Sequence, residues 1–415
     1  MRTVILLALS VALGSIPASA HANLLVGVAD QNVDTFSKPL YRQLGLPITR
    51  LVVPLDAARD PGRRAWVTDW LAAARAGGQT PLVSFGHFSG ESMRPPSAAA
   101  YRRAFSAFRR AFPSVGTYTT WNEANNQAQP TFHHPQLVAR YYRIMRSLCR
   151  RCRIVAADVL DNHSAPAWLR SFLGAVRGPK PRLWGLHNYS DVNRHHRIAY
   201  SGTARVLATV PGQLWLTETG GVVQSAALRF DNQRAATAMR YLFTLARAWP
   251  DRIRRIYVYN WRGVVTARSA RRHRKLWDSG LTDPNGQPRP SYFALRAELK
   301  RLRLGRWARR TAVRLSRPRW LGQRPAPRSE GALLSPPPSK PPVQQSAPSC
   351  ERLPRRGPGW PGTHPRLARP SPNAPRTRRS NFLRPSFRPK VGRRPYPCRG
   401  FQPRVAGTPS ALCCM

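Results

Sequence analysis

The 415-residue sequence has few acidic residues, few cysteines and no long hydrophobic run. Six cysteines in a chain that is 42% hydrophobic exclude a small disulfide scaffold, because a chain of this length can bury a sizeable core without crosslinks. The longest apolar stretch, Val4 to Ile16, is shorter than the roughly 18 residues that a membrane-spanning helix needs. We therefore expect no membrane span.

The N-terminal segment has the residue order of a secretory signal. Arg2 precedes the apolar stretch, and Ala18-Ser19-Ala20 follows it with the small residues typical of a cleavage site. Residues 1–22 are therefore predicted to be a signal peptide, with the mature chain starting near His21 or Asn23. A secreted, extracytoplasmic protein is expected.

Acidic residues are scarce, since 18 Asp and Glu stand against 68 Lys and Arg and the net charge is +50. Such an excess suggests an anionic partner, such as nucleic acid, anionic lipid or an acidic polymer. Over the first 303 residues, however, the basic side chains recur at most turns of the apparent helices, as on a solvated surface. We therefore predict no specific nucleic-acid site.

The composition changes near Leu304. Residues 304–415 hold 24 basic and 2 acidic residues and 22 of the 41 prolines, without helical or strand periodicity. Such a segment cannot bury enough apolar surface to offset its ordering entropy, so a disordered basic tail is predicted. It is either a cationic arm that contacts anionic surfaces or a frameshift or read-through product. The second reading is favoured, because no repeat, helix face or aromatic spacing organises the charge.

Cys149 and Cys152 are three positions apart at the end of a predicted helix. In an oxidising compartment, a local disulfide between them is expected. A zinc site would need a second ligand pair at suitable spacing, and the sequence has none. The pairs His133-His134 and His195-His196 cannot present both rings to one ion from regular structure. Neither a metal nor a cofactor is predicted.

Eight short apolar segments recur at intervals of 24 to 41 residues, separated by stretches with helical periodicity. Apolar strands that alternate with helices indicate a buried parallel sheet. At this count, residues 23–303 are predicted to close into a (β/α)8 TIM barrel, an α/β fold. A doubly wound open sheet is the alternative, but no G-x-G-x-x-G turn supports it. The predicted strands are residues 24–29, 48–53, 81–85, 116–121, 154–158, 183–187, 214–218 and 255–260.

Glutamate is rare in the predicted barrel, yet two glutamates end predicted strands. Of the four in the first 303 residues, Glu123 ends the fourth strand and Glu218 the seventh. Such barrels carry their chemistry at the carboxyl ends of the strands. Two carboxylates across that mouth suit cleavage of a glycosidic bond, since one protonates the leaving oxygen while the other attacks or stabilises an oxocarbenium-like centre. The alternative is that each glutamate only caps the following helix or forms an ion pair with a nearby arginine.

The residues around both glutamates resemble those of clan A retaining glycoside hydrolases, which are (β/α)8 barrels. Trp121-Asn122-Glu123-Ala124-Asn125 is similar to the W-N-E-P-N signature of family 39 and related family 5 enzymes, with alanine replacing the usual proline. Leu216-Thr217-Glu218-Thr219-Gly220 matches the nucleophile motif, and Trp277-Asp278-Ser279-Gly280-Leu281 resembles the clan's closing loop. The resemblance implies Glu123 as acid/base and Glu218 as nucleophile, with an O-glycosidic carbohydrate substrate and no cofactor.

The resemblance also implies which residues form the sugar subsite. Arg50 would fix the Glu218 carboxylate, Asn122 would bond the 2-hydroxyl of the sugar, and Trp261 would stack on a pyranose ring. Each of these residues also has a simpler interpretation when it is considered alone. Arg50 could form a salt bridge between strands, Asn122 could be a turn residue, and His87 could be a structural histidine. The implied set is Arg50, His87, Asn122, His187 or Tyr189, and Trp261.

Two other functions compete with a secreted retaining glycosidase. The first is a non-catalytic glycan-binding barrel, in which the pocket persists without turnover. The second is a basic envelope-binding or nucleic-acid-binding protein driven by the net charge. Its binding would fall steeply with salt and would persist after Glu123 and Glu218 are neutralised.

Overall fold

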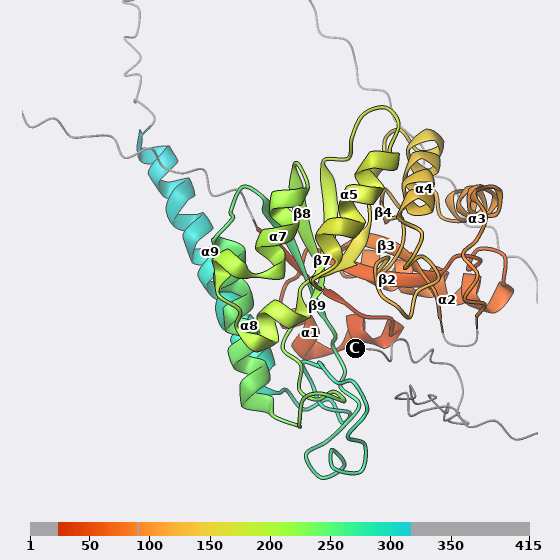
Figure 1. The fold of residues 1–415 in the computed structure, drawn as a ribbon. Coiled ribbons are helices and arrows are strands. Elements are labelled where there is room, and N and C mark those ends of the chain that lie inside the picture. The colour runs from red at the N-terminus through yellow and green to blue at the C-terminus, as the bar shows by residue number, and fades with distance from the viewer. Residues whose placement is uncertain (1–23, 89–90, 317–415) are drawn as a thin grey trace, which may run out of the picture. The chain divides into compact units, whose positions relative to one another are not determined.

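The computed structural model describes residues 24–88 and 91–316 (Figure 1). The predicted signal peptide and residues 317–415 of the predicted tail lie outside this part of the chain. Among the helices that are described, none is long and apolar enough to cross a membrane.

Parallel strands form the centre of the fold. Their order is β5-β4-β3-β2-β1-β9-β8-β7-β6, so neighbours in sequence are neighbours in the sheet, and the first strand, β1, pairs with the last, β9. The strands are β1 Leu25–Ala29, β2 Ile48–Pro54, β3 Thr80–Gly86, β4 Thr117–Thr119, β5 Arg153–Val155, β6 Asp158–Leu160, β7 Leu183–His187, β8 Gln213–Thr219 and β9 Ile253–Tyr259.

The strands β5 and β6 are two halves of one barrel strand. β5 pairs with β4, whereas β6 pairs with β7. Between the halves, the Ala156 N–H donates to the Leu183 carbonyl and the Gly185 N–H donates to the Ala157 carbonyl, both at 2.9 Å. The hydrogen bonding thus continues across the break and closes the sheet. The predicted (β/α)8 barrel is confirmed, with its fifth strand interrupted.

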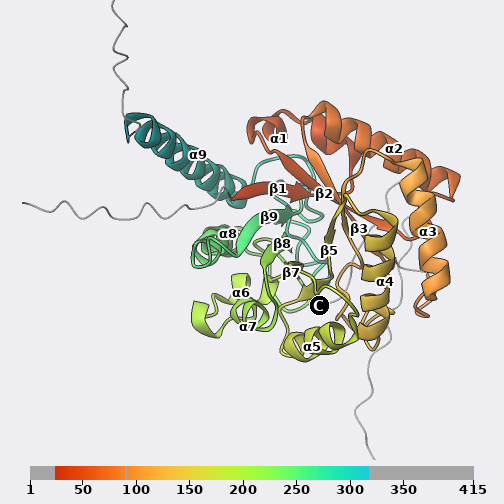
Figure 2. The same ribbon diagram turned by 90° about the horizontal axis from the view of Figure 1, so that it is seen from above.

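Helices surround the strands (Figure 2). Asp60, Ser97 and Asp231 cap α2, α3 and α8, because each side chain accepts from the backbone N–H three residues later. The helices are α1 Pro39–Gln43, α2 Pro61–Ala76, α3 Ala98–Ala111, α4 Pro135–Leu148, α5 Ala165–Ala175, α6 Tyr189–Arg194, α7 Gly202–Thr209, α8 Asn232–Arg247 and α9 Pro290–Ser316, with 3-10 helices η1 Val33–Ser37 and η2 Ile198–Tyr200.

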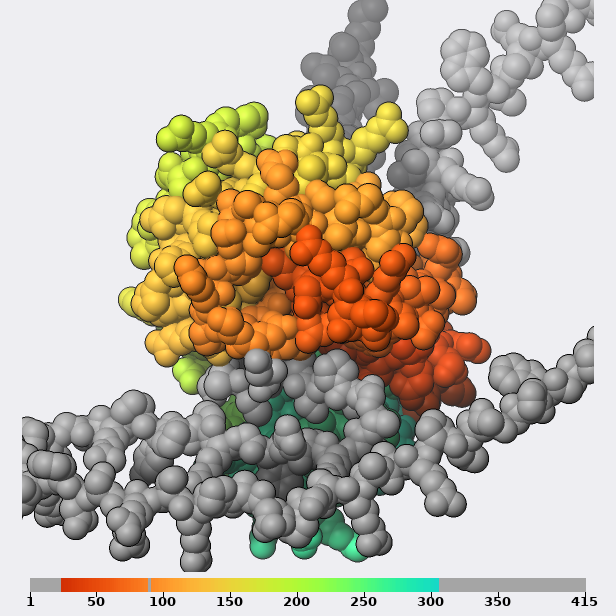
Figure 3. Space-filling view, turned by 90° about the vertical axis from the view of Figure 1, so that its right-hand side faces the viewer, coloured from red at the N-terminus to blue at the C-terminus, as the bar shows by residue number. Residues whose placement is uncertain are grey.

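Apolar side chains pack in two layers, one inside the barrel and one between strands and helices. On β9, Tyr257 and Tyr259 belong to the inner layer, whereas Ile256 and Val258 belong to the outer one, as the two-residue period of a strand requires. Figure 3 shows the outer surface on the side of α2 and α3, where the coloured residues run from red to yellow. Four tryptophans pack in the outer layer: Trp66, Trp70, Trp168 and Trp249.

The last helix is longer than predicted. The ordered domain is expected to end near residue 303, but α9 continues to Ser316. Residues 291–316 contain no proline, whereas Pro318 follows shortly after and disfavours further helix. The predicted boundary at residue 304 is therefore wrong for this helix. Its buried face includes Tyr292, Leu295 and Leu299, whereas Phe293 is 50% exposed.

A disulfide joins Cys149 and Cys152 at the end of α4, with the two Cα atoms 5.3 Å apart. The Cys149 N–H donates to the Met145 carbonyl, and the Cys152 N–H donates to the Cys149 carbonyl. The disulfide therefore encloses the single turn that leads from α4 into β5. The local crosslink predicted for these two cysteines lies here.

Candidate active site

Glu123 lies in a turn that leaves β4. The neighbouring strands hold this turn from both sides, since the Asn122 N–H donates to the Phe85 carbonyl at 2.6 Å and the Ala124 N–H donates to the Asp158 carbonyl at 2.8 Å. The φ angle of Glu123 is 47°, in the left-handed region that residues with a Cβ atom seldom adopt. Such a conformation persists where the surroundings enforce it, and it is frequent at functional sites.

Glu218 lies near the end of β8, where the strand is irregular. The register against β7 shifts at His187, and the register against β9 shifts between Leu216 and Thr219. Irregularities of this kind re-aim side chains at barrel rims. One carboxylate oxygen of Glu218, one of Glu123 and a ring nitrogen of His187 all lie within 4.8 Å of one another. The two glutamates predicted from separate strands thus meet in one site.

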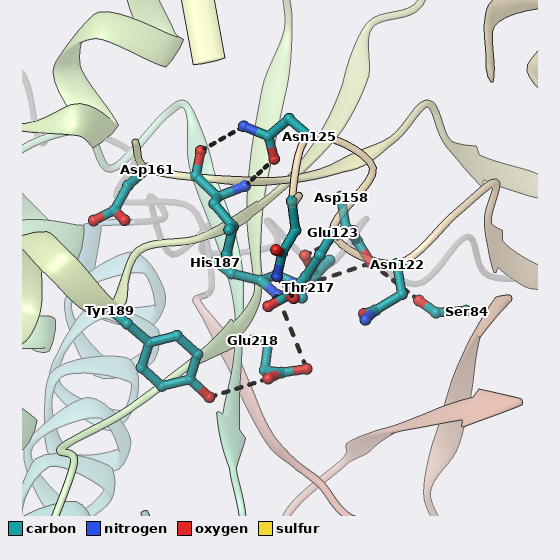
Figure 4. A network of polar contacts seen from close by, with 12 residues as sticks. Ser84, Asn122, Glu123, Asn125, Asp158, Asp161, His187, Tyr189, Thr217 and Glu218 are labelled. Atoms are coloured by element: carbon teal, nitrogen blue, oxygen red, sulfur yellow. Dashed lines mark hydrogen bonds and ion pairs between the residues drawn. The ribbon is translucent and has the colours of Figure 1, made fainter. Parts of the chain in front are cut away.

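Arg50 on β2 contacts both of the segments that carry the glutamates. Its Nη1 donates to Glu218 Oε2 at 2.7 Å, and its Nη2 donates to Asn122 Oδ1 at 2.6 Å and to Asp158 Oδ2 at 2.9 Å. Figure 4 shows these three partners, Glu218, Asn122 and Asp158. The side chain is fully buried, where an unpaired guanidinium would be strongly destabilising. Burial acts to lower the pKa of Arg50, but the charges of Asp158 and Glu218 raise it.

Asp158 on β6 is the central acid that the sequence analysis missed. Besides Arg50, it accepts from Ser84 Oγ at 3.1 Å and from Thr217 Oγ1 at 2.7 Å. Burial acts to raise the pKa of Asp158, but Arg50 and the nearby His187 ring outweigh it and hold the pKa below its usual value. The signal in the sequence was an aspartate at the end of an apolar strand.

His187 ends β7 and lies between the acids. Its Nδ1 is 3.0 Å from Glu123 Oε1 and 4.0 Å from Glu218 Oε2, and its Nε2 is 3.7 Å from Asp158 Oδ2. Burial and Arg50, 3.4 Å from Nε2, act to lower the pKa of His187, but the three acids raise it to about 9. His187 is therefore protonated at neutral pH and donates to Glu123.

Both oxygens of each glutamate are held. Tyr189, at the start of α6, donates its hydroxyl to Glu218 Oε1 at 3.2 Å, opposite the oxygen bound by Arg50. Asn126 Nδ2 donates to Glu123 Oε2 at 2.7 Å, opposite the oxygen that faces His187. The structure thus brings together Glu123, Glu218, Arg50, Asn122, His187 and Tyr189 from the predicted set.

His87 and Trp261 do not join this network. The His87 Nε2 is 2.9 Å from the Glu91 carbonyl, a local contact, and its backbone N–H donates to Gln129. Trp261 is 4% exposed, and its ring packs edge-to-face against Tyr41 and Tyr292 in the outer layer. The structure thus contradicts Trp261 as a platform for a sugar ring, because helix-facing aromatics already cover it.

Trp277 is the tryptophan that lies next to the site. It is half-buried, and its ring packs edge-to-face against Tyr189 with the ring centroids 5.0 Å apart. Since Tyr189 bonds Glu218, Trp277 is one contact away from the carboxylate. The sequence contained the motif around Trp277, but nothing in the spacing showed that this ring, and not that of Trp261, lies beside the glutamates.

Residues 96–293 match the family model described as the glycosyl hydrolase catalytic core. The chain contains a glycosyl hydrolase catalytic core. The matched range includes Glu123, Asp158, His187 and Glu218, while Arg50 precedes it. The matched range thus contains most of the residues that form the hydrogen-bond network.

Several solved glycoside hydrolases are similar in fold. They include a family 39 enzyme from the gut symbiont Bacteroides cellulosilyticus WH2 (15% identity, 67% of this chain and 63% of that chain, TM-score 0.47), a GH10 endoxylanase from a sugarcane soil metagenome (10%, 67% and 97%, 0.49) and xylanase 10B from Thermotoga maritima (12%, 68% and 96%, 0.47). The chain thus spans 63% of the family 39 enzyme's length. Comparison with curated proteins found no match.

The spacing of Glu123, His187 and Glu218 in this glycosyl hydrolase core would also allow a metal ion. The surrounding charges do not fit one. Arg50 donates to Glu218 at 2.7 Å, and protonated His187 has no free lone pair on the nitrogen that faces Glu123. A cation would have to displace two positive side chains, so we assign no metal to these residues.

Proposed function

We propose that the core is a retaining glycosidase that hydrolyses O-glycosidic bonds by double displacement. The observation that carries this proposal is the approach of Glu123 and Glu218 oxygens to within 4.8 Å. Retaining enzymes separate their carboxyl groups by about 5–5.5 Å, whereas inverting enzymes leave roughly 6.5–9.5 Å for a water molecule. The short separation favours direct attack by one carboxylate.

In the first step, a Glu218 oxygen attacks the anomeric carbon while Glu123 protonates the glycosidic oxygen. The carbon–oxygen bond to the leaving group breaks, and a glycosyl ester forms on Glu218. Arg50 and Tyr189 donate to the two Glu218 oxygens, which favours the carboxylate form and orients it. Protonated His187 donates its Nδ1 proton to Glu123, and that proton passes through the Glu123 carboxyl group to the departing alcohol, which leaves His187 neutral.

In the second step, Glu123 removes a proton from water, whose oxygen attacks the anomeric carbon and releases Glu218. The sugar thus leaves with the configuration it had before cleavage, because two inversions cancel. Asn122, fixed by Arg50 through its Oδ1, keeps its amide nitrogen available for the 2-hydroxyl of the sugar. That bond would strengthen in the transition state.

The anomeric configuration of the first product tests this mechanism. Proton NMR during hydrolysis of an aryl glycoside should show the substrate's own anomer first, followed by mutarotation. The Glu218→Gln variant, which keeps the side-chain shape, is the control for contaminating glycosidases. Initial release of the opposite anomer would contradict the proposal.

We also propose that the protein is exported and acts on glycans outside the cytoplasm. The signal-like residues 1–22 support this proposal, as does the disulfide between Cys149 and Cys152, which persists in oxidising compartments. Fractionation of expressing cells, with N-terminal sequencing of the released protein, should give a mature chain that starts near Asn23. Full-length protein retained in the cytoplasm would contradict it.

A further inference from the structure

The segment that follows β9 carries a concentration of positive charge. Residues 262–276, called the basic loop here, contain six Arg and Lys and no acidic residue. Five of these side chains have no hydrogen bond or ion pair with any other residue in the described part of the chain, and all five are exposed. They are Arg268, Arg271, Arg272, Arg274 and Lys275.

The basic loop is packed, although its charges point outward. Val265 and Ala270 are buried, at 0% and 4% exposure. Arg289 forms two hydrogen bonds to the Asp278 carboxylate, at 2.7 and 2.9 Å, and Asp278 also accepts from the backbone of Val264 and Val265. Internal ion pairing thus fixes the base of the loop and leaves the exposed cations unneutralised.

The loop lies at the mouth of the proposed active site. Gln224, from the segment after β8, donates to the His273 carbonyl at 2.7 Å and so joins the loop to the strand of Glu218. Lys275 is two residues from Trp277, so their Cα atoms are at most about 7 Å apart. Trp277 in turn packs on Tyr189. Figure 1 shows the basic loop, in green to teal, extending beyond the end of the barrel.

We propose that the basic loop binds anionic groups of the substrate, and therefore that the substrate is an acidic glycan bearing carboxylate or sulfate groups. The paired N–H groups of a guanidinium match the oxygens of a carboxylate or a sulfate. Five cations without an ion-pair partner would contribute little to the binding of a neutral sugar. Because the loop leads into Trp277, which packs on Tyr189, such groups would belong to the part of the glycan at the edge of the active site. This inference rests on the proposed glycosidase function and names its substrate class.

The test compares two full-length variants that each remove four positive charges. One is R271Q/R272Q/R274Q/K275Q in the basic loop. The matched control is R140Q/R143Q/R146Q/R150Q, on and just after α4, whose four exposed side chains lie on the outside of the barrel. Both variants keep residues 317–415, so the charge of that segment is the same in each.

Binding is measured by affinity electrophoresis in gels containing polygalacturonate, glucuronoxylan or chondroitin sulfate, with E218Q in every chain to prevent turnover. Gels with the carboxyl-reduced or desulfated form of each polymer, duplex DNA and anionic vesicles are run beside them. For at least one acidic polymer, the loop variant should bind roughly tenfold more weakly and the control within about twofold, since each screened ion pair contributes a few-fold. The neutral form of that polymer should show no difference.

Three results would overturn the inference: binding to none of the acidic polymers, equal losses in both variants, or a larger loss for DNA or vesicles than for any glycan. The last result would make the loop a site for another kind of polyanion. Hydrolysis by the chain with Glu218 intact is assayed separately. Loop-dependent binding without any hydrolysis would contradict the proposed function and leave the glycan site standing.

Discussion

Arg50 is the residue that links the site together. A single guanidinium donates to Glu218, Asn122 and Asp158, which come from β8, the turn after β4, and β6. Asp158 touches neither glutamate in this network, so it acts through Arg50 and is a positioning residue. Its loss should therefore disturb both the fold and the orientation of Glu218.

The Asp158→Asn variant should unfold more easily by about 3–5 kcal/mol, because it leaves the buried Arg50 with one fewer negative partner. Urea denaturation of this variant and of Asp251→Asn, an exposed aspartate, gives the comparison. The Asp251 variant should change by less than about 0.5 kcal/mol. Equal stability of the two variants would show that Asp158 does not balance the charge of Arg50.

His187 should make the stability depend on pH. Its folded pKa of about 9 lies above the ordinary histidine value of about 6.5, so the protonated form contributes stability that is complete below pH 6.5 and is lost as pH rises through 9. At about 1.4 kcal/mol for each pKa unit, the loss is about 3 kcal/mol. The free energy of unfolding of the wild type should fall relative to that of His187→Gln over this range. Parallel curves from pH 6 to 10 would contradict the protonated state.

Glu123→Ala should separate acid catalysis from nucleophilic attack. Substrates with poor leaving groups should lose about 100-fold to 10,000-fold in kcat, since they need the proton that Glu123 supplies. Dinitrophenyl glycosides, whose leaving group needs no proton, should form the glycosyl ester at nearly the wild-type rate. A stopped-flow burst of dinitrophenol measures this step. Equal losses on both kinds of substrate would contradict the acid role.

At the scale of elements, the strands were predictable and their interruptions were not. Apolar runs at regular spacing located every barrel strand to within a few residues. The break at Ala156 and Ala157 arises because the two halves pair with different neighbours, which local sequence does not encode. The end of α9 is predicted too early for a different reason: dense positive charge is typical of disorder, but Arg and Leu are also good helix formers.

Truncation after Gly305 should leave the melting temperature within about 2 °C, because the buried apolar residues described on α9, such as Tyr292, Leu295 and Leu299, all precede this point. The cut keeps Arg303, which donates to the Leu44 carbonyl. Leu295→Ala, which removes a fully buried side chain of the same helix, should cost about 2–5 kcal/mol. A fall of many degrees on truncation, matching that of Leu295→Ala, would show that later residues stabilise the barrel.

At the scale of the whole molecule, residues far apart in sequence make the site. Arg50 and Glu218 are 168 positions apart, and only closure of the barrel brings them together. The glutamates were predictable because strand ends converge in this fold. Trp261 was mispredicted because the chain leaves β9 before it, so the inside–outside alternation no longer fixes its ring. Side-chain direction at such points depends on tertiary packing, here with Tyr41 and Tyr292.

The central claim is that Glu218 attacks the anomeric carbon, and chemical rescue of Glu218→Ala tests it most directly. The variant should be inactive on aryl glycosides, and added azide should restore part of the turnover by entering the vacated space as an external nucleophile. The product should be a glycosyl azide of inverted configuration, because only one displacement occurs. A variant that keeps wild-type activity, or an azide product of retained configuration, would contradict the assignment.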